Sequence, residues 1–132
     1  MIVCVLDDLL FSVKISTAAK AMGADVYFER TPDMAFARIK ERQPSLVIFD
    51  LNSAKLRPMD AIRALKADPE LKGIRTLGYV SHVQTETIDA ARVAGIDEVL
   101  ARSAFSERLG EILTAGSKGP GLRAPDEPRP RS

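Results

Sequence analysis

The sequence has little of what small secreted proteins rely on for stability. Its 132 residues include a single cysteine, Cys4, and no tryptophan, and aromatic residues make up only 5%. One thiol cannot form an intramolecular disulfide, whereas small secreted domains usually carry several cysteines. We therefore expect Cys4, which lies inside an apolar run, to be a small buried apolar residue.

Long apolar runs and a strong excess of one charge are also missing. No stretch approaches the ~18 consecutive apolar residues of a membrane-spanning helix. The opening MIVCVLDDLLF has no basic leading region and is interrupted by two aspartates, which argues against a signal peptide. The formal net charge is +1, so the overall balance favours neither nucleic acid nor an anionic membrane as a partner. The expectation is a soluble, cytoplasmic protein.

The composition changes near Gly116. The segment 117–132 (SKGPGLRAPDEPRPRS) holds four of the eight prolines and almost nothing to bury. Such a segment cannot recover the entropy that ordering would cost. We therefore predict one domain over residues 1–116 and a disordered Pro/Gly/Arg-rich tail over residues 117–132.

Within the predicted domain, short apolar runs alternate with amphipathic stretches. Strands are predicted at residues 2–6, 25–28, 46–49, 76–80 and 98–101. Helices are predicted at residues 11–22, 32–42, 58–67, 86–94 and 106–113. Gly23 and Gly95 follow two of these helices as C-terminal caps. Strict alternation implies right-handed crossovers and an α/β, doubly wound parallel sheet with helices on both faces.

Carboxylates follow two of the predicted strands. Asp7 and Asp8 close the first strand, and Asp50 closes the third. In parallel α/β sheets, chemistry collects beyond the carboxyl ends of the strands. Three carboxylates gathered there repel one another and require a cation, and oxygen ligands suit Mg²⁺ above all. The pattern therefore predicts an Mg²⁺ site built from Asp7, Asp8 and Asp50.

This order of strands and aspartates resembles the response-regulator receiver domain (CheY-like) over residues 1–115. Residues 66–71 (KADPEL), followed by Ile74, are similar to the family's loop before its fourth strand. Residues 94–100 (AGIDEVL) are similar to its turn into the fifth strand. The resemblance implies the flavodoxin-like five-stranded sheet with strand order 2-1-3-4-5.

The resemblance also implies roles for individual residues. Asp50 would accept a phosphoryl group from a sensor histidine kinase or a phosphotransfer protein. Asp8 would bind Mg²⁺ directly, Asp7 mostly through a water, and Asn52 through its backbone carbonyl. Because no effector domain follows, output would come from docking of a downstream protein partner. We expect a phosphoryl acceptor rather than an enzyme with its own substrate turnover, and a homodimer is compatible with this role.

The sequence departs from the family's pattern around the expected phosphate site. Val80 stands where the family has threonine or serine, and valine offers no hydrogen-bond donor. Ser81 is adjacent, but it would serve only after a one-residue slip that turns every side chain of the strand to the opposite face. Arg102 replaces a lysine and keeps the positive charge with a different geometry. Val99 stands where the family has a switch aromatic.

Several alternatives stay open. His82, the only histidine, is expected in a solvent-facing loop, with contact to a bound anion as the alternative. Tyr79 is expected in the core, with a role as a substitute switch aromatic as the alternative. A pseudo-receiver that binds partners without phosphorylation is the alternative function. A flavodoxin-type or nucleotide-binding protein would need a phosphate loop where residues 7–10 read Asp-Asp-Leu-Leu.

Overall fold

A parallel five-stranded sheet forms the centre of the protein, in a computed structural model that describes residues 1–81 and 84–118. The strand order is β2-β1-β3-β4-β5, and all neighbouring strands pair in parallel. The strands are β1 (Ile2–Val5), β2 (Val26–Glu29), β3 (Leu46–Asp50), β4 (Arg75–Val80) and β5 (Glu98–Ala101). The predicted α/β class and the strand order implied by the resemblance are confirmed.

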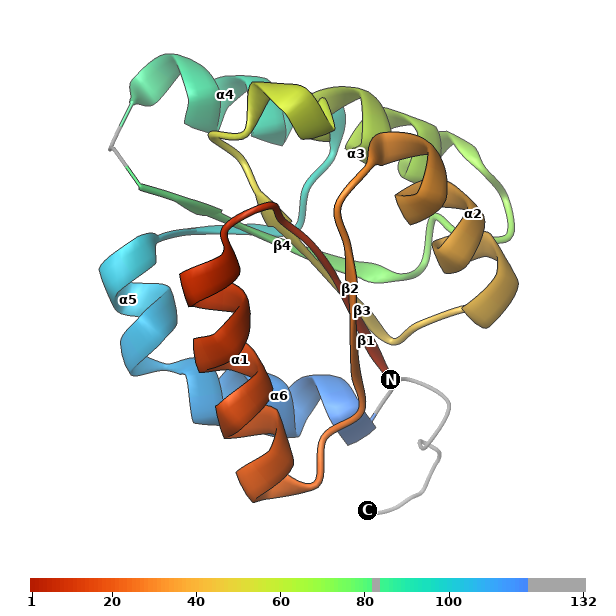
Figure 1. The fold of residues 1–132 in the computed structure, drawn as a ribbon. Helices are drawn as coiled ribbons and strands as arrows, with labels where there is room; N and C mark the ends of the chain where they lie inside the picture. The colour runs from red at the N-terminus through yellow and green to blue at the C-terminus, as the bar shows by residue number, and fades with distance from the viewer. Residues whose placement is uncertain (82–83, 119–132) are drawn as a thin grey trace.

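Helices cover both faces of the sheet, as Figure 1 shows, with α1, α5 and α6 on one face and α2, α3 and α4 on the other. The helices are α1 (Leu9–Met22), α2 (Pro32–Arg42), α3 (Pro58–Ala67), α4 (Thr85–Ala94), α5 (Arg102–Glu107) and α6 (Leu109–Lys118). A short 3-10 helix, η1 (Ala54–Leu56), lies between β3 and α3. Within the described residues, no helix is long and apolar enough to cross a membrane.

Several helix ends follow directly from the sequence. The Thr31 side chain accepts a hydrogen bond from the amide of Met34 and caps α2, whose first residue is Pro32. Gly23 ends α1 with φ 69° and Gly95 ends α4 with φ 108°. Both values lie in the left-handed region that glycine adopts without a steric penalty, so the predicted C-terminal caps are confirmed.

The end of the chain differs from the prediction of one helix at residues 106–113. Instead, α5 begins at Arg102, directly after β5, and a break at Arg108 (φ −96°, ψ 10°) separates it from α6. Ala101 gives α5 no side-chain cap, so the sequence carries no start signal there. Helix α6 continues to Lys118, two residues past the predicted domain end, and residues 119–132 of the predicted tail lie outside the described residues.

Two apolar cores form, one on each face of the sheet. All four residues of β1 are at most 1% exposed, as expected for a central strand buried on both faces. Cys4 is fully buried in the core beneath α1, α5 and α6, which confirms the expectation for this residue, and burial raises the pKa of its thiol. Central strands held on both faces give their carboxyl ends fixed positions, and the candidate site lies there.

Candidate functional site

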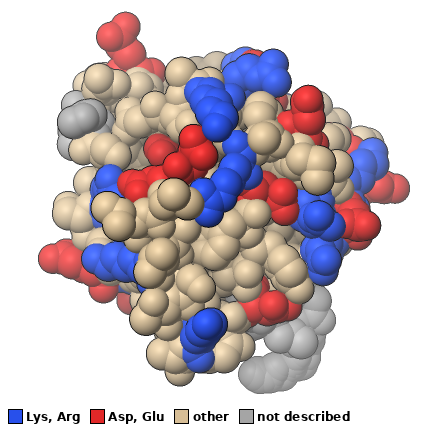
Figure 2. All heavy atoms as spheres, viewed as in Figure 1, with Lys and Arg blue, Asp and Glu red and all other residues tan. Residues whose placement is uncertain are grey.

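The carboxyl ends of β1 and β3 bring the predicted aspartates to one edge of the sheet. Val5 of β1 pairs in register with Phe49 of β3, so Asp7 and Asp8 follow one strand while Asp50 ends its neighbour. Figure 2 shows acidic and basic side chains interspersed over the face it views, with no large area of a single charge. The electrostatic environment of each aspartate therefore depends on its nearest charged neighbours.

Asp8 is held by two donors, one on each carboxylate oxygen. Its Oδ1 accepts a hydrogen bond from the amide of Phe11 at 3.0 Å, which makes Asp8 the N-cap of α1. Its Oδ2 accepts from Nη2 of Arg102 at 2.7 Å. The Phe11 amide and the Arg102 guanidinium together hold the pKa of Asp8 below its usual value, although burial opposes them. Each oxygen of the carboxylate thus has one donor.

Arg102 is fixed by a second contact as well. Its guanidinium carbon lies 4.3 Å from the centroid of the Phe11 ring, a cation–π arrangement. Phe11 is itself 4% exposed, and its ring packs against Tyr79 and Phe105 with centroids 5.0 and 5.6 Å away. Arg102 therefore rests on a buried aromatic cluster and points its charge at Asp8.

Asp7 also has a cationic partner. Its Oδ2 accepts from Nζ of Lys55, in η1, at 3.2 Å. Both side chains are exposed, Asp7 to 38% and Lys55 to 62%. Such an exposed pair is weak and easily exchanged for water.

Asp50 is the exception among the three aspartates, because it has no ion pair with any described residue. Its Oδ1 accepts a hydrogen bond from the amide of Asn52 at 3.0 Å. The side chain is half-buried, and this burial raises the pKa of Asp50. The amide of Asn52 and the charge of Arg102 act in the opposite direction, while Asp8 adds to the rise.

Residues 79–81 lie at the end of β4, and their side chains face different surroundings. Val80 is 2% exposed and packs in the core beneath α2, α3 and α4, and its pairing with Ala101 leaves the strand unshifted. Tyr79 is 1% exposed and points to the opposite core, as expected. Its hydroxyl is the one buried side-chain polar atom without a hydrogen-bond partner among the described residues. Ser81 is exposed just beyond the strand.

Asn52 has a contact that sequence reasoning missed. Its side-chain Oδ1 accepts a hydrogen bond from the amide of Ser81 at 2.6 Å. The predicted role of its backbone carbonyl toward a metal stays a prediction. Val99 is half-buried and packs against the core beneath α2, α3 and α4. His82 lies outside the described residues.

The donor set suits a hard cation in kind but not in arrangement. Carboxylate oxygens are the ligands that Mg²⁺ prefers. Two of the three carboxylates, however, already pair with Lys55 and Arg102. Across residues 1–81 and 84–118, no group of three or more His, Cys, Asp or Glu side chains is placed to hold a metal ion. As it stands, the site does not fit the predicted Mg²⁺.

Comparisons with known proteins point to one kind of structure. No protein-family model matches the chain, and no curated protein matches it. Solved structures do match, among them a response regulator from Hahella chejuensis with 15% identity and a TM-score of 0.78, covering 86% of this chain and 91% of that one. The chain has the receiver fold.

Two further receiver structures add context. The phosphorylated cyanobacterial phytochrome response regulator RcpA is 21% identical with a TM-score of 0.68, covering 89% of this chain and 90% of that one. The Mn²⁺-bound response regulator Rcp1 is 19% identical with a TM-score of 0.69, covering 84% of this chain and 89% of that one. At such identities the likeness establishes the receiver fold, and site chemistry must come from this chain's own residues.

The candidate site contains contacts that the sequence pattern did not reveal. Asp8 precedes a helix and is a preferred N-cap residue, so its bond to Phe11 had a local signal. The bond from Arg102 to Asp8 joins residues 94 positions apart, and the bond from Lys55 to Asp7 joins residues 48 apart. No periodicity or spacing rule reaches across such separations, so these pairs required the structure.

Proposed function

We propose that this receiver-fold domain accepts a phosphoryl group on Asp50 and signals by docking to a downstream protein. The observation that carries this proposal is the contrast among the three aspartates. Asp7 and Asp8 are engaged by cations, whereas Asp50 has no ion pair among the described residues and is oriented by the amide of Asn52. An oriented, unpaired carboxylate at the rim of the sheet is the group available for nucleophilic attack.

The transfer would proceed from a phosphohistidine of a sensor kinase or a phosphotransfer protein. An Asp50 carboxylate oxygen forms the new P–O bond, and the P–N bond to the histidine breaks. The imidazole nitrogen leaves with the electron pair and takes a proton from solvent. Arg102, whose charge already acts on Asp50, provides positive charge near the phosphoryl oxygens. Such transfer takes place in the cytoplasm, and Mg²⁺ as a cofactor stays a prediction.

Two similar proteins lend support through what their structures contain. RcpA was crystallised in a phosphorylated state, and Rcp1 was crystallised with Mn²⁺. Both share the receiver fold with this chain, which supports the proposal.

The test is phosphorylation of the purified protein by acetyl phosphate or phosphoramidate, followed by intact mass and peptide mapping. We expect one phosphoryl group on wild type and none on Asp50→Asn. Asp89→Asn is the matched control, because Asp89 is exposed on α4 and its replacement should leave phosphorylation intact. An unmodified wild-type mass with both donors would refute the proposal.

A pseudo-receiver is the second candidate, and one specific observation favours it. Val80 fills a core position without a hydroxyl, and Arg102 is already bound to Asp8, so the usual groups for sensing a phosphoryl oxygen are absent or engaged. If this reading holds, Asp50→Asn leaves the cellular output unchanged. A loss of output in Asp50→Asn, with Asp89→Asn normal, would exclude it.

A further inference from the structure

The ion pair with Arg102 engages Asp8, one of the carboxylates predicted to bind a divalent cation. We propose that Arg102 competes with divalent cations for Asp8, so that this site takes a metal ion only when the pair opens. The proposal concerns cation binding by the unmodified protein and does not depend on phosphorylation of Asp50. Its first support is the geometry at Asp8, where Nη2 of Arg102 lies 2.7 Å from Oδ2.

Both carboxylate oxygens of Asp8 already have a donor, so a metal ion would have to share an oxygen with that donor or displace it. The Phe11 amide is bound to Oδ1 and belongs to the first turn of α1, so it cannot move away without uncapping that helix. Arg102 is therefore the partner that a cation would displace. A divalent ion bound to Asp8 beside the Arg102 guanidinium would also experience like-charge repulsion.

The guanidinium is anchored, which distinguishes this pair from an ordinary surface ion pair. It lies 4.3 Å from the centroid of the buried Phe11 ring, and the charged side chains of Arg102 and Asp8 are 38% and 33% exposed. A charge-assisted hydrogen bond combined with a cation–π contact is stronger than either alone. Because only molecules with an open pair would bind the metal ion, the closed pair lowers the apparent metal affinity in proportion to the open fraction.

The neighbouring pair provides an internal comparison. Lys55 is 62% exposed, and no aromatic ring contact of its ammonium is found among the described residues. Its pair with Asp7 at 3.2 Å is of the exposed kind that contributes little. If only net charge opposed binding of a divalent ion, Lys55 and Arg102 would weaken that binding equally. If the anchored pair opposes it, Arg102 weakens the binding more than Lys55 does.

The experiment is a titration of the full chain with Mn²⁺, followed by electron paramagnetic resonance of the free ion, and with Mg²⁺ by calorimetry. We expect Arg102→Gln to bind Mn²⁺ at least about tenfold more tightly than wild type, which corresponds to about 1.4 kcal/mol. Lys55→Gln should change Kd by less than about threefold. Arg63→Gln, which removes a cation on α3, should leave Kd unchanged. Equal gains in Lys55→Gln and Arg102→Gln would overturn the proposal, as would no gain in Arg102→Gln.

A second measurement on wild type protects against loss of folding in Arg102→Gln. In NMR spectra, Mg²⁺ should shift the Arg102 side-chain Nε–H signal and the Phe11 ring signals together with the Asp8 amide. A shift at Asp8 with unmoved Arg102 and Phe11 signals would overturn the proposal. A failure of Asp50 phosphorylation alongside a gain of affinity in Arg102→Gln would refute the proposed function and uphold the competition.

Discussion

The Asn52 side chain accepts a hydrogen bond from the amide of Ser81, with Oδ1 and N 2.6 Å apart. This contact joins the loop after β3 to the end of β4. The amide of Asn52 simultaneously donates to Asp50 at 3.0 Å. Asn52 thus orients the candidate phosphoryl acceptor and holds the neighbouring strand end. A displacement of either strand end would therefore be transmitted to the other through Asn52.

Removal of this tether should lower stability modestly. We expect Asn52→Ala to reduce the free energy of unfolding by about 1 kcal/mol, because one hydrogen bond is lost at an exposed position. Urea denaturation measures this loss, and hydrogen exchange should show faster exchange of the Ser81 amide. Asn52→Asp retains an acceptor oxygen and should keep Ser81 protected. Equal Ser81 exchange in wild type and Asn52→Ala would contradict the tether.

Most of the fold could be predicted from the sequence, because the residue patterns that determine its strands and helix ends are local. The apolar run of β1 and the left-handed Gly23 and Gly95 act within a few residues, and each prediction is confirmed. The strand order came from the resemblance, since alternation alone does not determine which strands are neighbours. The uncapped start of α5 carried no signal and was missed.

The candidate site could be predicted from the sequence only in part. The spacing of Asp7, Asp8 and Asp50 after two strands placed them at one sheet edge, because parallel strands end together. Their partners come from η1 and from the start of α5, far away in sequence. Which cation neutralises which carboxylate is decided by tertiary packing, so the sequence predicted a metal where the structure places Lys55 and Arg102.

Gly78 should tolerate no larger side chain, because Leu51 packs directly over it. A Cβ built on Gly78 would lie 2.6 Å from Cδ1 of Leu51 and 2.8 Å from Cδ1 of Ile96. We expect Gly78→Ala to lower the free energy of unfolding by about 1–3 kcal/mol through overpacking. Leu51 follows Asp50 directly, so amide shifts should move in the Asp50 loop. Gly73→Ala is the control, since nothing lies within 4 Å of a Cβ there.

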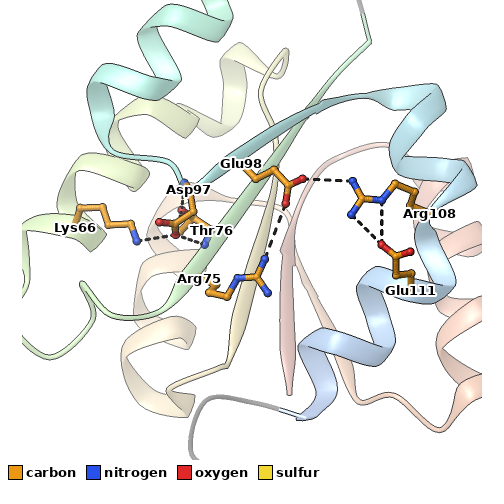
Figure 3. A network of polar contacts seen from close by, with 7 residues as sticks. All are labelled: Lys66, Arg75, Thr76, Asp97, Glu98, Arg108 and Glu111. Carbon is orange, nitrogen blue, oxygen red and sulfur yellow. Dashed lines mark hydrogen bonds and ion pairs between the residues drawn. The ribbon is translucent and has the colours of Figure 1, made fainter.

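Two adjacent acidic residues at the start of β5, Asp97 and Glu98, should contribute very differently to the stability of the fold. As Figure 3 shows, Asp97 contacts Thr76 and Lys66, whereas Glu98 contacts Arg75 and Arg108. Oδ2 of Asp97 accepts from the Thr76 amide at 2.8 Å, from the Thr76 hydroxyl at 2.9 Å and from Nζ of Lys66 at 3.0 Å. Thr76 is only 1% exposed, so water cannot replace this acceptor.

We therefore expect Asp97→Ala to lower the free energy of unfolding by about 1–3 kcal/mol, and Glu98→Ala to cause a much smaller loss. Burial alone would raise the pKa of Asp97, but the hydrogen bonds from Lys66 and Thr76 outweigh it and lower the pKa. A lowered pKa means that the stabilisation is complete above the unfolded-state value and is lost as pH falls through the folded-state value. Denaturation at neutral pH and at progressively lower pH below 3.8 measures both effects. Similar losses for Asp97→Ala and Glu98→Ala would contradict this assignment.

Asp50 should destabilise the fold at neutral pH. Burial raises its pKa above the ordinary value of an aspartate, so the folded state holds the proton more tightly than the unfolded state. Its contribution to stability is therefore greatest below pH 3.8 and declines as pH rises through the folded-state pKa. Asp50→Asn keeps an oxygen to accept from the Asn52 amide and removes the charge.

We accordingly expect Asp50→Asn to unfold at a higher urea concentration than wild type at neutral pH. The difference should shrink as pH falls toward 3.8. Asp89→Asn, at an exposed position on α4, should show no such pH-dependent gain. A wild type that is more stable than Asp50→Asn at neutral pH would show that a favourable partner outweighs burial at Asp50.

Tyr79→Phe should leave the protein as stable or make it more stable. The Tyr79 hydroxyl is buried and unpaired among the described residues, and a buried polar group without a partner costs about 1–3 kcal/mol. Phenylalanine retains the ring contacts with Phe11 and Phe105, whose centroids lie 5.0 and 5.1 Å away. Urea denaturation should therefore show a gain of up to about 1 kcal/mol, with Tyr27→Phe on β2 as the matched control. A loss of stability would show that the hydroxyl finds a partner in solution, and Asp50, its neighbour in the sheet register, would be the first residue to examine.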